Sequence, residues 1–523
     1  MVIESNAEIA SLADLPGFQA TRRADNAAVI YGDRQLSFRD LDDRSNAVAN
    51  GLGKEQLEPG DRVAFLDRNS ERFFEVLFGV AKSRSVFVTI NFRLAPREVE
   101  YILSDSNTRV LFVASEYLPL IEKIREQLPD LRTVIVLDDA DSGRYEGWLN
   151  EQSRSEPEVK VEPTDGAVQM YTSGTTGNPK GVELSHQAMV QAAVAGLSVW
   201  PFLCERGGAV LGTMPLFHIA AANLCIAALY AGATAVIVRD VSPQELAEII
   251  PEQRITLVPL PATVIHAMLR LPGIRDRDFS ALRTMLVAGS GIAPELVREA
   301  GETFQCGFAL SYGSTETCGG MTYLGPDECT PDAGDLLGSA GKTLGDAEIM
   351  IADEDGNELP RGEVGEILCR SSRLMTSYWR KPDATQDAIR DGWFWSGDAG
   401  YLDEEGYLFV VDRIKDMVIS GGENIYPTEI ENVLHMHEDV EDVAVVGIPD
   451  ERWGESLLAF IVAKEGRQID GGQLEDYLRD KLAGFKIPRR YEFVDEFPRN
   501  ATGKVLKREL RRPYWEGKER NVG

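Results

Sequence analysis

Short apolar runs alternate with amphipathic segments along the first part of the chain. Residues 63–66 and 85–90 have the composition of strands, and Asn69 or Ser70 is placed to cap a helix between them. Apolar side chains recur there at helical spacing: Phe73, Phe74, Leu77, Phe78 and Ala81. A strand, a helix and a strand in succession form a βαβ unit, so this pattern predicts a parallel sheet.

The pattern continues and then changes character. Further strands of the first type are expected at residues 110–113, 134–137, 210–213, 235–238 and 284–288. After Gly338, glycine-rich turns separate short strands at residues 347–352, 365–369 and 406–411, which indicates a β-rich subdomain. From Lys415 onward, expected strands at residues 443–446, 458–462 and 491–494 mix with expected helices at 427–434 and 472–482.

These patterns predict an α/β protein with a large N-terminal part and a small C-terminal part. The N-terminal domain, residues 1–413, is layered α/β and contains the β-rich subdomain. A hinge is expected at residues 414–416, followed by a small α+β domain at residues 417–523. A chain of 523 residues is too long for one hydrophobic core, which agrees with this division.

Charge and composition exclude several classes of function. The formal net charge is −30, which argues against a general nucleic-acid partner because phosphate backbones require a basic surface. No apolar run is long enough to predict a transmembrane segment, and the first residues show no secretory signal. The six cysteines have no paired spacing and suit a reducing compartment. A cytoplasmic location is therefore expected.

The strongest chemical signal is residues 171–181, Tyr-Thr-Ser-Gly-Thr-Thr-Gly-Asn-Pro-Lys-Gly. Glycines let the backbone approach an anion closely, and the hydroxyls and Lys180 can donate hydrogen bonds to phosphate oxygens. The apolar residues 167–171 indicate a strand that leads into this loop. The loop is not a Walker A motif, because Pro179 and Gly181 flank the lysine. A flexible surface turn is the alternative, but it does not explain the combination of residues.

Three other stretches carry side chains suited to a nucleotide. Gly289-Ser290-Gly291 follows an expected strand, at the end where α/β sheets bind ligands. Tyr312-Gly313-Ser314-Thr315-Glu316 combines an aromatic ring that can stack on adenine, a hydroxyl that can reach a phosphate and a carboxylate that can bind Mg²⁺. Asp398 lies in Ser396-Gly397-Asp398, where a carboxylate can accept hydrogen bonds from ribose hydroxyls.

In order and spacing, these motifs resemble those of the adenylate-forming superfamily, which comprises acyl-CoA synthetases, adenylation domains of peptide synthetases and firefly-type luciferases. The resemblance covers nearly the whole chain. It implies that ATP or AMP is bound by Thr172, Ser173, Gly174, Thr175, Thr176, Gly177, Lys180, Gly289, Ser290, Gly291, Tyr312, Gly313, Ser314, Thr315, Asp398, Arg413 and Lys504. It further implies that Glu316 and Thr176 hold Mg²⁺.

The resemblance also implies roles in the chemistry. Lys504, in Pro498-Arg499-Asn500-Ala501-Thr502-Gly503-Lys504, would bridge the acyl carboxylate and the α-phosphate, with Thr315 and His218 as the other catalytic residues. Taken alone, His218 is better explained as the cap of a core helix. His186 is interpreted as the cap of the helix after the glycine-rich loop. The acyl pocket would be lined by Phe217, His218, Ala221, Ala222, Gly319, Gly320 and Met321.

The small domain would be a mobile lid that rotates at Lys415. Ser420, Gly421, Gly422 and Glu423 would then border the CoA tunnel, although a hairpin turn with Gly-Gly at its tip explains the same residues. Both interpretations can hold. Asp412 stands where the family usually has Gly, and Arg413 after it is intact.

The expected reaction is ATP-dependent activation of a fatty, aryl or steroid-type carboxylic acid to acyl-AMP, followed by transfer to CoA. Its partners are thus the small acid, ATP and CoA, with Mg²⁺ as cofactor. The alternatives are a ligase that passes the acyl group to a carrier protein and, from a different class, a non-catalytic nucleotide sensor. A sensor should lack Lys504 or Glu316, and both are present. A homodimer and a lysine acetyltransferase acting on Lys504 are further partners that the resemblance leaves open.

Overall fold

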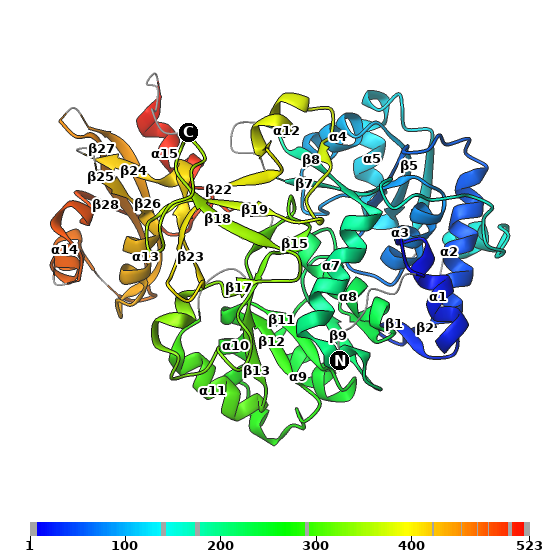
Figure 1. Ribbon diagram of the computed structural model, residues 1–523, viewed down its shortest axis with the longest axis horizontal. Coiled ribbons are helices and arrows are strands. Elements are labelled where there is room, and N and C mark those ends of the chain that lie inside the picture. The colour runs from blue at the N-terminus through cyan, green and yellow to red at the C-terminus, as the bar shows by residue number, and fades with distance from the viewer. Residues whose placement is uncertain are drawn as a thin grey trace. The chain divides into compact units, whose positions relative to one another are not determined.

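The computed structural model describes residues 8–137, 143–172, 178–287, 292–420, 423–450, 452–467, 469–479, 481–499 and 505–516 (Figure 1). Two compact units are formed by the chain, and each is discontinuous in sequence. The first comprises Met1–Ile349 and Cys369–Phe394, and the second comprises Met350–Leu368 and Trp395–Gly523. The predicted hinge at residues 414–416 lies within the second unit. The predicted domain boundaries stay a prediction.

A seven-stranded sheet forms one part of the first unit, in the order β13-β12-β11-β9-β10-β1-β2. Its strands are β1 (Ala27–Tyr31), β2 (Arg34–Ser37), β9 (Ala209–Gly212), β10 (Thr234–Ile237), β11 (Leu257–Leu260), β12 (Thr284–Val287) and β13 (Gly307–Leu310). All neighbours are parallel except β1 and β2. The strands from β9 to β12 are buried, as expected for a parallel sheet covered on both faces.

A second seven-stranded sheet has the order β20-β8-β7-β4-β3-β5-β6. Its strands are β3 (Arg62–Leu66), β4 (Val86–Thr89), β5 (Thr108–Ala114), β6 (Thr133–Leu137), β7 (Gly166–Thr172), β8 (Lys180–Ser185) and β20 (Ser377–Tyr378). The strands β3 to β7 are parallel, whereas β8 and β20 are antiparallel additions at one edge. The predicted βαβ unit and layered α/β fold are confirmed.

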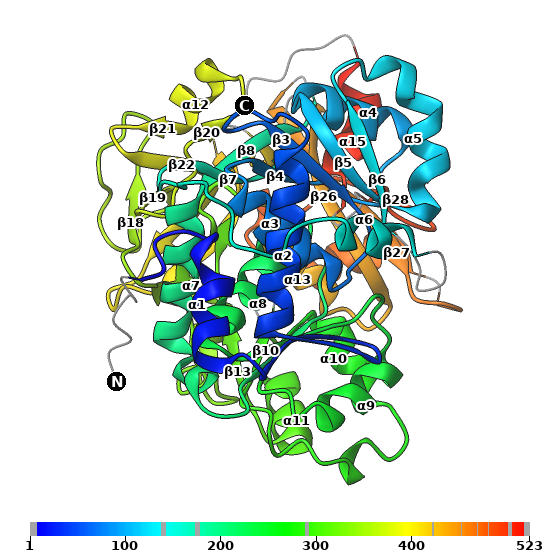
Figure 2. The same cartoon turned by 90° about the vertical axis from the view of Figure 1, so that its right-hand side faces the viewer.

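Helices cover these sheets, and the local sequence explains where some of them begin. They are α1 (Asp14–Arg23), α2 (Phe38–Gly53), α3 (Arg72–Lys82), α4 (Pro96–Asp105), α5 (Leu118–Ile124), α6 (Arg144–Asn150), α7 (His186–Val199), α8 (Ile219–Ala231), α9 (Pro243–Glu252), α10 (Ala262–Leu269), α11 (Pro294–Phe304) and α12 (Pro382–Ala388). A capping box of Ser37 and Asp40 starts α2, which lies beside α3 (Figure 2). Every residue of α3 is buried, so it is a core helix.

Two predicted helix caps are wrong. The N-cap residue of α3 is Glu71, because the Asn69 side chain bonds to Met214 and Val238, just after β9 and β10, and Ser70 donates to Asp67. We also expected His186 to cap the helix after the glycine-rich loop. The strand β8 intervenes, Ser185 caps α7 by accepting from the Ala188 N–H, and His186 is the buried first residue of the helix.

The second unit is rich in β-structure. Much of it is a sheet that includes β18 (Glu348–Ala352), β19 (Gly365–Arg370), β22 (Trp393–Leu402) and β23 (Leu408–Arg413). The remainder is a five-stranded sheet of β24 (Val418–Ser420), β25 (Glu423–Ile425), β26 (Val440–Asp450), β27 (Gly454–Ala463) and β28 (Arg490–Phe493). Three helices accompany it: α13 (Pro427–His435), α14 (Gly471–Arg479) and α15 (Lys507–Trp515). Apolar clusters involve both faces of this sheet, which confirms the predicted small α+β part.

Candidate active site

The glycine-rich loop joins the strands β7 and β8 of an antiparallel hairpin. Thr172 and Lys180 are paired opposite each other at its base. The predicted phosphate contacts Ser173, Gly174, Thr175, Thr176 and Gly177 lie outside the described residues. Tyr101 donates a hydrogen bond of 3.0 Å to the Pro179 carbonyl, directly before Lys180. Both ends of the loop are thus held by defined contacts.

Buried polar side chains brace the arms of this hairpin. Gln169 is fully buried; its Oε1 accepts from Arg62 Nε at 3.1 Å, and its Nε2 donates to the Tyr171 hydroxyl at 3.1 Å. Arg62 also pairs with Glu183 on β8 and packs over the Trp379 ring. A side chain at Gly181 would place its Cβ 2.5 Å from Gln169 Nε2, so a larger residue there would force the buried Gln169 carboxamide to move. The hairpin is therefore a rigid support for the loop.

The second predicted motif, Tyr312 to Glu316, begins a tight turn. The short strands β14 (Gly313–Ser314) and β15 (Gly319–Gly320) pair with each other, and a Cβ at Gly313 would lie 2.0 Å from the Gly319 carbonyl oxygen. Thr317, which the sequence analysis missed, is buried at the centre of this turn. Its hydroxyl accepts from the Ser314 N–H at 2.9 Å and donates to the Gly319 carbonyl at 2.8 Å.

The turn and the hairpin meet at Glu316. Its Oε1 accepts hydrogen bonds from the Thr172 hydroxyl at 3.3 Å and from the Tyr378 hydroxyl at 3.0 Å. The Lys180 ammonium lies 4.4 Å from the centre of the Tyr378 ring. Burial, followed by the Glu316 charge, raises the pKa of Tyr378 well above its ordinary value, so the phenol stays a donor. The structure thus brings together three predicted residues and one, Tyr378, that no sequence pattern indicated.

This cluster fits a magnesium ion delivered with ATP. Mg²⁺ in nucleotide sites typically takes one or two carboxylates and completes its shell with phosphate oxygens and water. Among the described residues, Glu316 provides that carboxylate. The second predicted ligand, Thr176, lies outside them.

His218 directly precedes α8, at the end of a segment that Asn69 holds in place. The Asn69 carboxamide donates to the Met214 and Val238 carbonyls and accepts from the Leu216 N–H at 2.8 Å. The imidazole packs on Phe217, with ring centres 4.3 Å apart. Burial, and secondarily the charge of Arg93, lowers the pKa of His218 to about 4. The ring is therefore neutral near pH 7, which suits positioning better than proton donation.

Two parts of the predicted acyl pocket are in contact. Ala221 and Ala222 are buried on α8, and Asn223 of the same helix donates to the Cys318 carbonyl at 2.8 Å. Gly319 and Gly320 follow in the turn, and Met321 after them is fully buried. Another missed residue, Arg373, is 1% exposed and donates to the carbonyls of Gly320 and Leu344 at 2.6 and 2.8 Å. α8 and this turn thus form one apolar wall fixed by buried donors.

The second unit holds the predicted ribose contacts and lid residues. Asp398 and Arg413 are paired across β22 and β23, with Oδ1 and Nε 3.5 Å apart. Asp412, the residue that departs from the family pattern, accepts from the Thr428 N–H at the start of α13. Arg511 donates to the Lys415 carbonyl at 3.3 Å and pairs with Asp416 at 3.2 Å.

The predicted CoA segment forms a hairpin, as the simpler interpretation proposed. Ser420 of β24 is paired with Glu423 of β25, and Gly421 and Gly422 between them lie outside the described residues. Gly289, Ser290 and Gly291, which follow β12, also lie outside. The same is true of Lys504, although the chain on either side of its loop is joined by a bridge between Arg499 and Val505.

Comparison with known proteins gives the class. Residues 18–379 match the AMP-binding enzyme family, and residues 429–504 match the AMP-binding enzyme C-terminal domain. The chain is 39% identical over 518 residues to the fatty acid–[acyl-carrier-protein] ligase ScoC of Streptomyces coeruleorubidus, covering 98% of each chain. It is 36% identical over 492 residues to a feruloyl-CoA synthase of an Amycolatopsis species, covering 93% of this chain and 96% of the relative.

Solved structures agree with this result. The o-succinylbenzoate CoA synthetase MenE from Bacillus subtilis, in complex with ATP and magnesium ion, has a TM-score of 0.84 and 29% identity, covering 95% of this chain and 98% of that one. The protein therefore belongs to the AMP-binding enzyme family of the adenylate-forming superfamily. The predicted enzyme class, an AMP-forming acid–thiol ligase, is confirmed. Among the described residues, no helix is long and apolar enough to span a membrane.

Proposed function

We propose that the protein activates a carboxylic acid with MgATP to form acyl-AMP and pyrophosphate, and then transfers the acyl group to the CoA thiol. The observation that carries this proposal is the cluster at Glu316. Two motifs far apart in sequence meet there through Thr172, and Lys180 lies beside them on Tyr378. A cation, hydroxyl donors and one fixed carboxylate are the groups required to bind a triphosphate with its metal.

In the first half-reaction, a carboxylate oxygen attacks the α-phosphate and pyrophosphate leaves. Lys504, Thr315 and His218 are proposed to hold the reacting oxygens and to stabilise the charge that develops on the phosphate, so catalysis is mainly positioning and electrostatics. The Mg²⁺ bound with ATP would supply charge neutralisation for the phosphates. In the second half-reaction, rotation at Lys415 is proposed to remove Lys504 and to expose the acyl-AMP carbonyl to the thiol.

The acid is proposed to be a fatty, aryl or steroid-type acid. Ile219–Ala231 is apolar along almost its whole length, and its buried small side chains leave no charge to meet a polar substituent. Relatives are named for fatty acids, for a feruloyl group and for indoleacetate. A panel of such acids, assayed one at a time for ATP-dependent pyrophosphate release, tests the proposal. If none of these acids supports pyrophosphate release, the proposal is contradicted.

A cluster in the second unit favours CoA as the acceptor. The guanidinium carbons of Arg452 and Arg489 lie 4.6 and 4.9 Å from the Trp453 ring centre. The next residue, Gly454, is paired with Ser420 of the predicted CoA segment. An indole flanked by two cations suits a phosphorylated adenine nucleotide, because the ring can stack and the cations can pair with phosphates.

A carrier protein is the second candidate acceptor, because the relative ScoC is named for one. Supplied acyl-AMP can be offered to CoA, to pantetheine and to a phosphopantetheinylated carrier protein in separate reactions. If CoA is the acceptor, thioester forms faster with CoA than with pantetheine, and Arg489→Ala removes that preference. Rapid transfer to the carrier protein with none to CoA would establish the second candidate.

A further inference from the structure

A short segment of the chain, residues 371–379, crosses from the turn of Glu316 to the hairpin, and we call it the strap. The Met375 N–H donates to the Glu316 carbonyl at 2.7 Å. The Thr376 and Trp379 N–H groups donate to the Glu183 and Gly181 carbonyls at 2.9 and 2.7 Å. Within the strap, Ser377 and Tyr378 form β20, which pairs with β8. Backbone bonds therefore place Tyr378 between the two predicted ATP-binding motifs.

Tyr378 contacts both motifs with different parts of its side chain. The hydroxyl donates to Glu316 Oε1 at 3.0 Å, which is shorter than the 3.3 Å bond from Thr172 to the same oxygen. The ring lies beneath Lys180, at 4.4 Å from ammonium to ring centre. The side chain is 7% exposed, so its position is determined by packing. Within the described part of the chain, Glu316 Oε2 accepts no hydrogen bond.

We propose that Tyr378 is a positioning residue for MgATP: its hydroxyl fixes one oxygen of Glu316 so that the other is presented to the metal, and its ring holds Lys180 toward the phosphates. This role rests on the proposed function. A carboxylate that is free to rotate must lose that freedom when it binds an ion, whereas one held by two hydroxyls is already oriented. A lysine packed on an aromatic face is likewise restricted without losing its charge.

The two contacts predict separable effects. Tyr378→Phe removes the hydroxyl and keeps the ring beneath Lys180. It should reduce the strengthening of ATP binding by Mg²⁺ and leave metal-free ATP binding unchanged. Tyr378→Leu removes the ring as well, so it should also weaken metal-free ATP binding. Each loss is expected to be on the order of tenfold or less, since one hydrogen bond to a charged group or one cation–π contact is involved.

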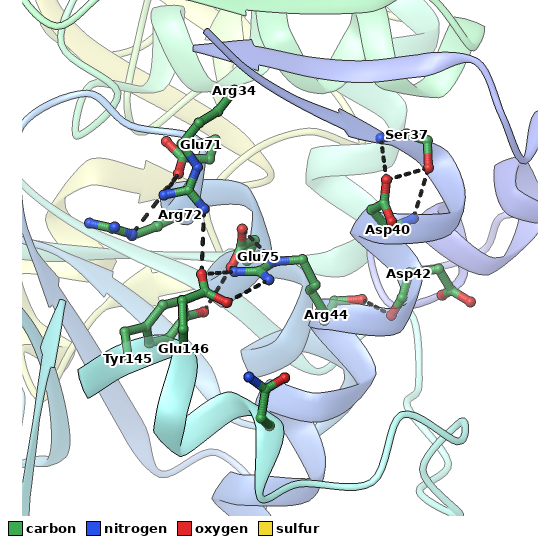
Figure 3. Close-up of polar contacts among 12 residues, drawn as sticks. Arg34, Ser37, Asp40, Asp42, Arg44, Glu71, Arg72, Glu75, Tyr145 and Glu146 are labelled. Atoms are coloured by element: carbon green, nitrogen blue, oxygen red, sulfur yellow. Dashed lines mark hydrogen bonds and ion pairs between the residues drawn. The ribbon is translucent and has the colours of Figure 1, made fainter. Parts of the chain in front are cut away.

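The chain supplies a matched control in Tyr145. Its hydroxyl donates to Glu75 Oε2 at 3.0 Å, the same length as the bond from Tyr378 to Glu316. In Figure 3, Tyr145 lies with Glu75, Glu146 and Arg44 in a partly buried ionic network that contains no predicted ATP contact. Tyr145→Phe therefore removes an equivalent phenol–carboxylate bond elsewhere in the first unit. It should lower the melting temperature without changing how Mg²⁺ affects ATP binding.

The test is isothermal titration of the full chain with ATP, in Mg²⁺ and in EDTA, for the wild type and the three variants. The quantity compared is the dissociation constant of ATP in EDTA divided by that in Mg²⁺, which measures how much Mg²⁺ strengthens binding. A reduced ratio in Tyr378→Phe, together with a wild-type ratio in Tyr145→Phe, supports the role of the hydroxyl. A wild-type ratio in Tyr378→Phe overturns it, as does an equal reduction in Tyr145→Phe, which would indicate general loosening. Equal metal-free affinities for the Phe and Leu variants overturn the role of the ring.

A second variant covers the case in which Tyr378→Phe does not fold. Thr172→Val removes the other hydroxyl bound to Glu316 Oε1 and should reduce the same ratio, with an unchanged ratio counting against the proposal. The wild type separates this inference from the proposed function. If wild-type ATP binding is absent or is not strengthened by Mg²⁺, the proposed function fails and this role fails with it. If the wild type behaves as expected and the variants do not, only the inference fails.

Discussion

His186 and His218 are two imidazoles that the fold keeps neutral. Burial lowers the pKa of each to about 4, and nearby Asp165 and Asp14 only partly oppose this for His186. Neither ring nitrogen of His186 has a hydrogen-bond partner among the described residues. Protonation of either ring would place an unpaired charge in the interior, so both histidines favour unfolding in acid.

The pH dependence of stability should therefore have a defined sign. An unfolded histidine has a pKa near 6.5, so between about pH 4 and 6.5 each of these two sites binds more protons in the unfolded chain than in the folded one. Their contribution to the free energy of unfolding should rise with pH in that window and fall on acidification. His186→Leu should reduce the slope by up to about 1.4 kcal/mol per pH unit. Urea unfolding of the variant and the wild type near pH 5 and pH 7 gives the free energy of unfolding at each pH. An identical change with pH in both proteins would contradict the prediction.

Lys504 is the residue on which the first half-reaction should depend most. Lys504→Ala removes a cation that faces charge present only in the adenylation transition state, so pyrophosphate release should fall by about 10²–10³-fold. Thioester formation from supplied acyl-AMP and CoA should stay close to wild type. The control is Lys481→Ala, because Lys481 lies on the exposed surface over Tyr477. Equal damage to both half-reactions by the Lys504 variant would exclude the assigned role.

At the scale of elements, the strap is held by the buried cation Arg373 as well as by backbone bonds. Arg373 donates to two carbonyls and pairs with Asp346 at 3.2 Å, while only 1% of its side chain is exposed. Removing a buried cation leaves its acceptors without donors, which is more damaging than losing a surface pair. The strap, the turn after Glu316 and the apolar wall that this turn forms with α8 should therefore loosen together.

Arg373→Met should reduce the free energy of unfolding of the first unit by about 3 kcal/mol and broaden the range of acids that release pyrophosphate. Arg370→Met is the matched control, since Arg370 lies three positions earlier and forms an exposed pair with Glu348. Loss of this exposed ion pair should change the free energy of unfolding by about 0–1 kcal/mol. Denaturant unfolding and the acid panel provide the two measurements. A similar loss of stability in both variants would show that the burial of Arg373 is unimportant.

Elements were easier to predict than the contacts between them. Most buried strands of the two large sheets could be located because each is a short apolar run bounded by turns, although β11 and β13 were not predicted. The cap of α3 could not be located, because Asn69 bonds to residues that follow β9 and β10 and are distant in sequence. The residues around Tyr378 carry no chemical pattern, and only the pairing of β20 with β8 brings its hydroxyl to Glu316. Glycine-rich loops, in contrast, have compositions that reveal their chemistry.

For the whole molecule, the feature that bears on the proposed two-step reaction is the segment around Lys415. Arg511 of α15 bonds to the Lys415 carbonyl and pairs with Asp416, so the predicted pivot is attached to the last helix. Asp412, directly before this segment, accepts from the Thr428 N–H at the start of α13, so rotation at Lys415 should break this bond. The helices after the pivot, α13 and α15, should move together.

Lys415→Pro fixes φ near about −65° and should trap one orientation of the lid. Adenylation should survive and thioester formation should fall sharply, which is the reverse of the result expected for Lys504→Ala. The carbonyl that Arg511 contacts is retained in proline, and Lys415→Ala serves as the control for loss of the side chain. Pyrophosphate release and CoA thioester formation are assayed separately. Wild-type rates for both steps in the proline variant would place the pivot elsewhere.

The strap also has a consequence for how the protein is made. β8 lies between β7 and β20, yet β20 is encoded far downstream, after the chain has passed through part of the second unit. At about 5–20 residues per second, a ribosome needs roughly 10–40 s to travel from one strand to the other. During that interval β8 is an open sheet edge, the kind of surface that pairs with other chains. A nascent or truncated chain that ends before Ser377 should therefore aggregate more readily than the full-length protein and depend more on chaperones.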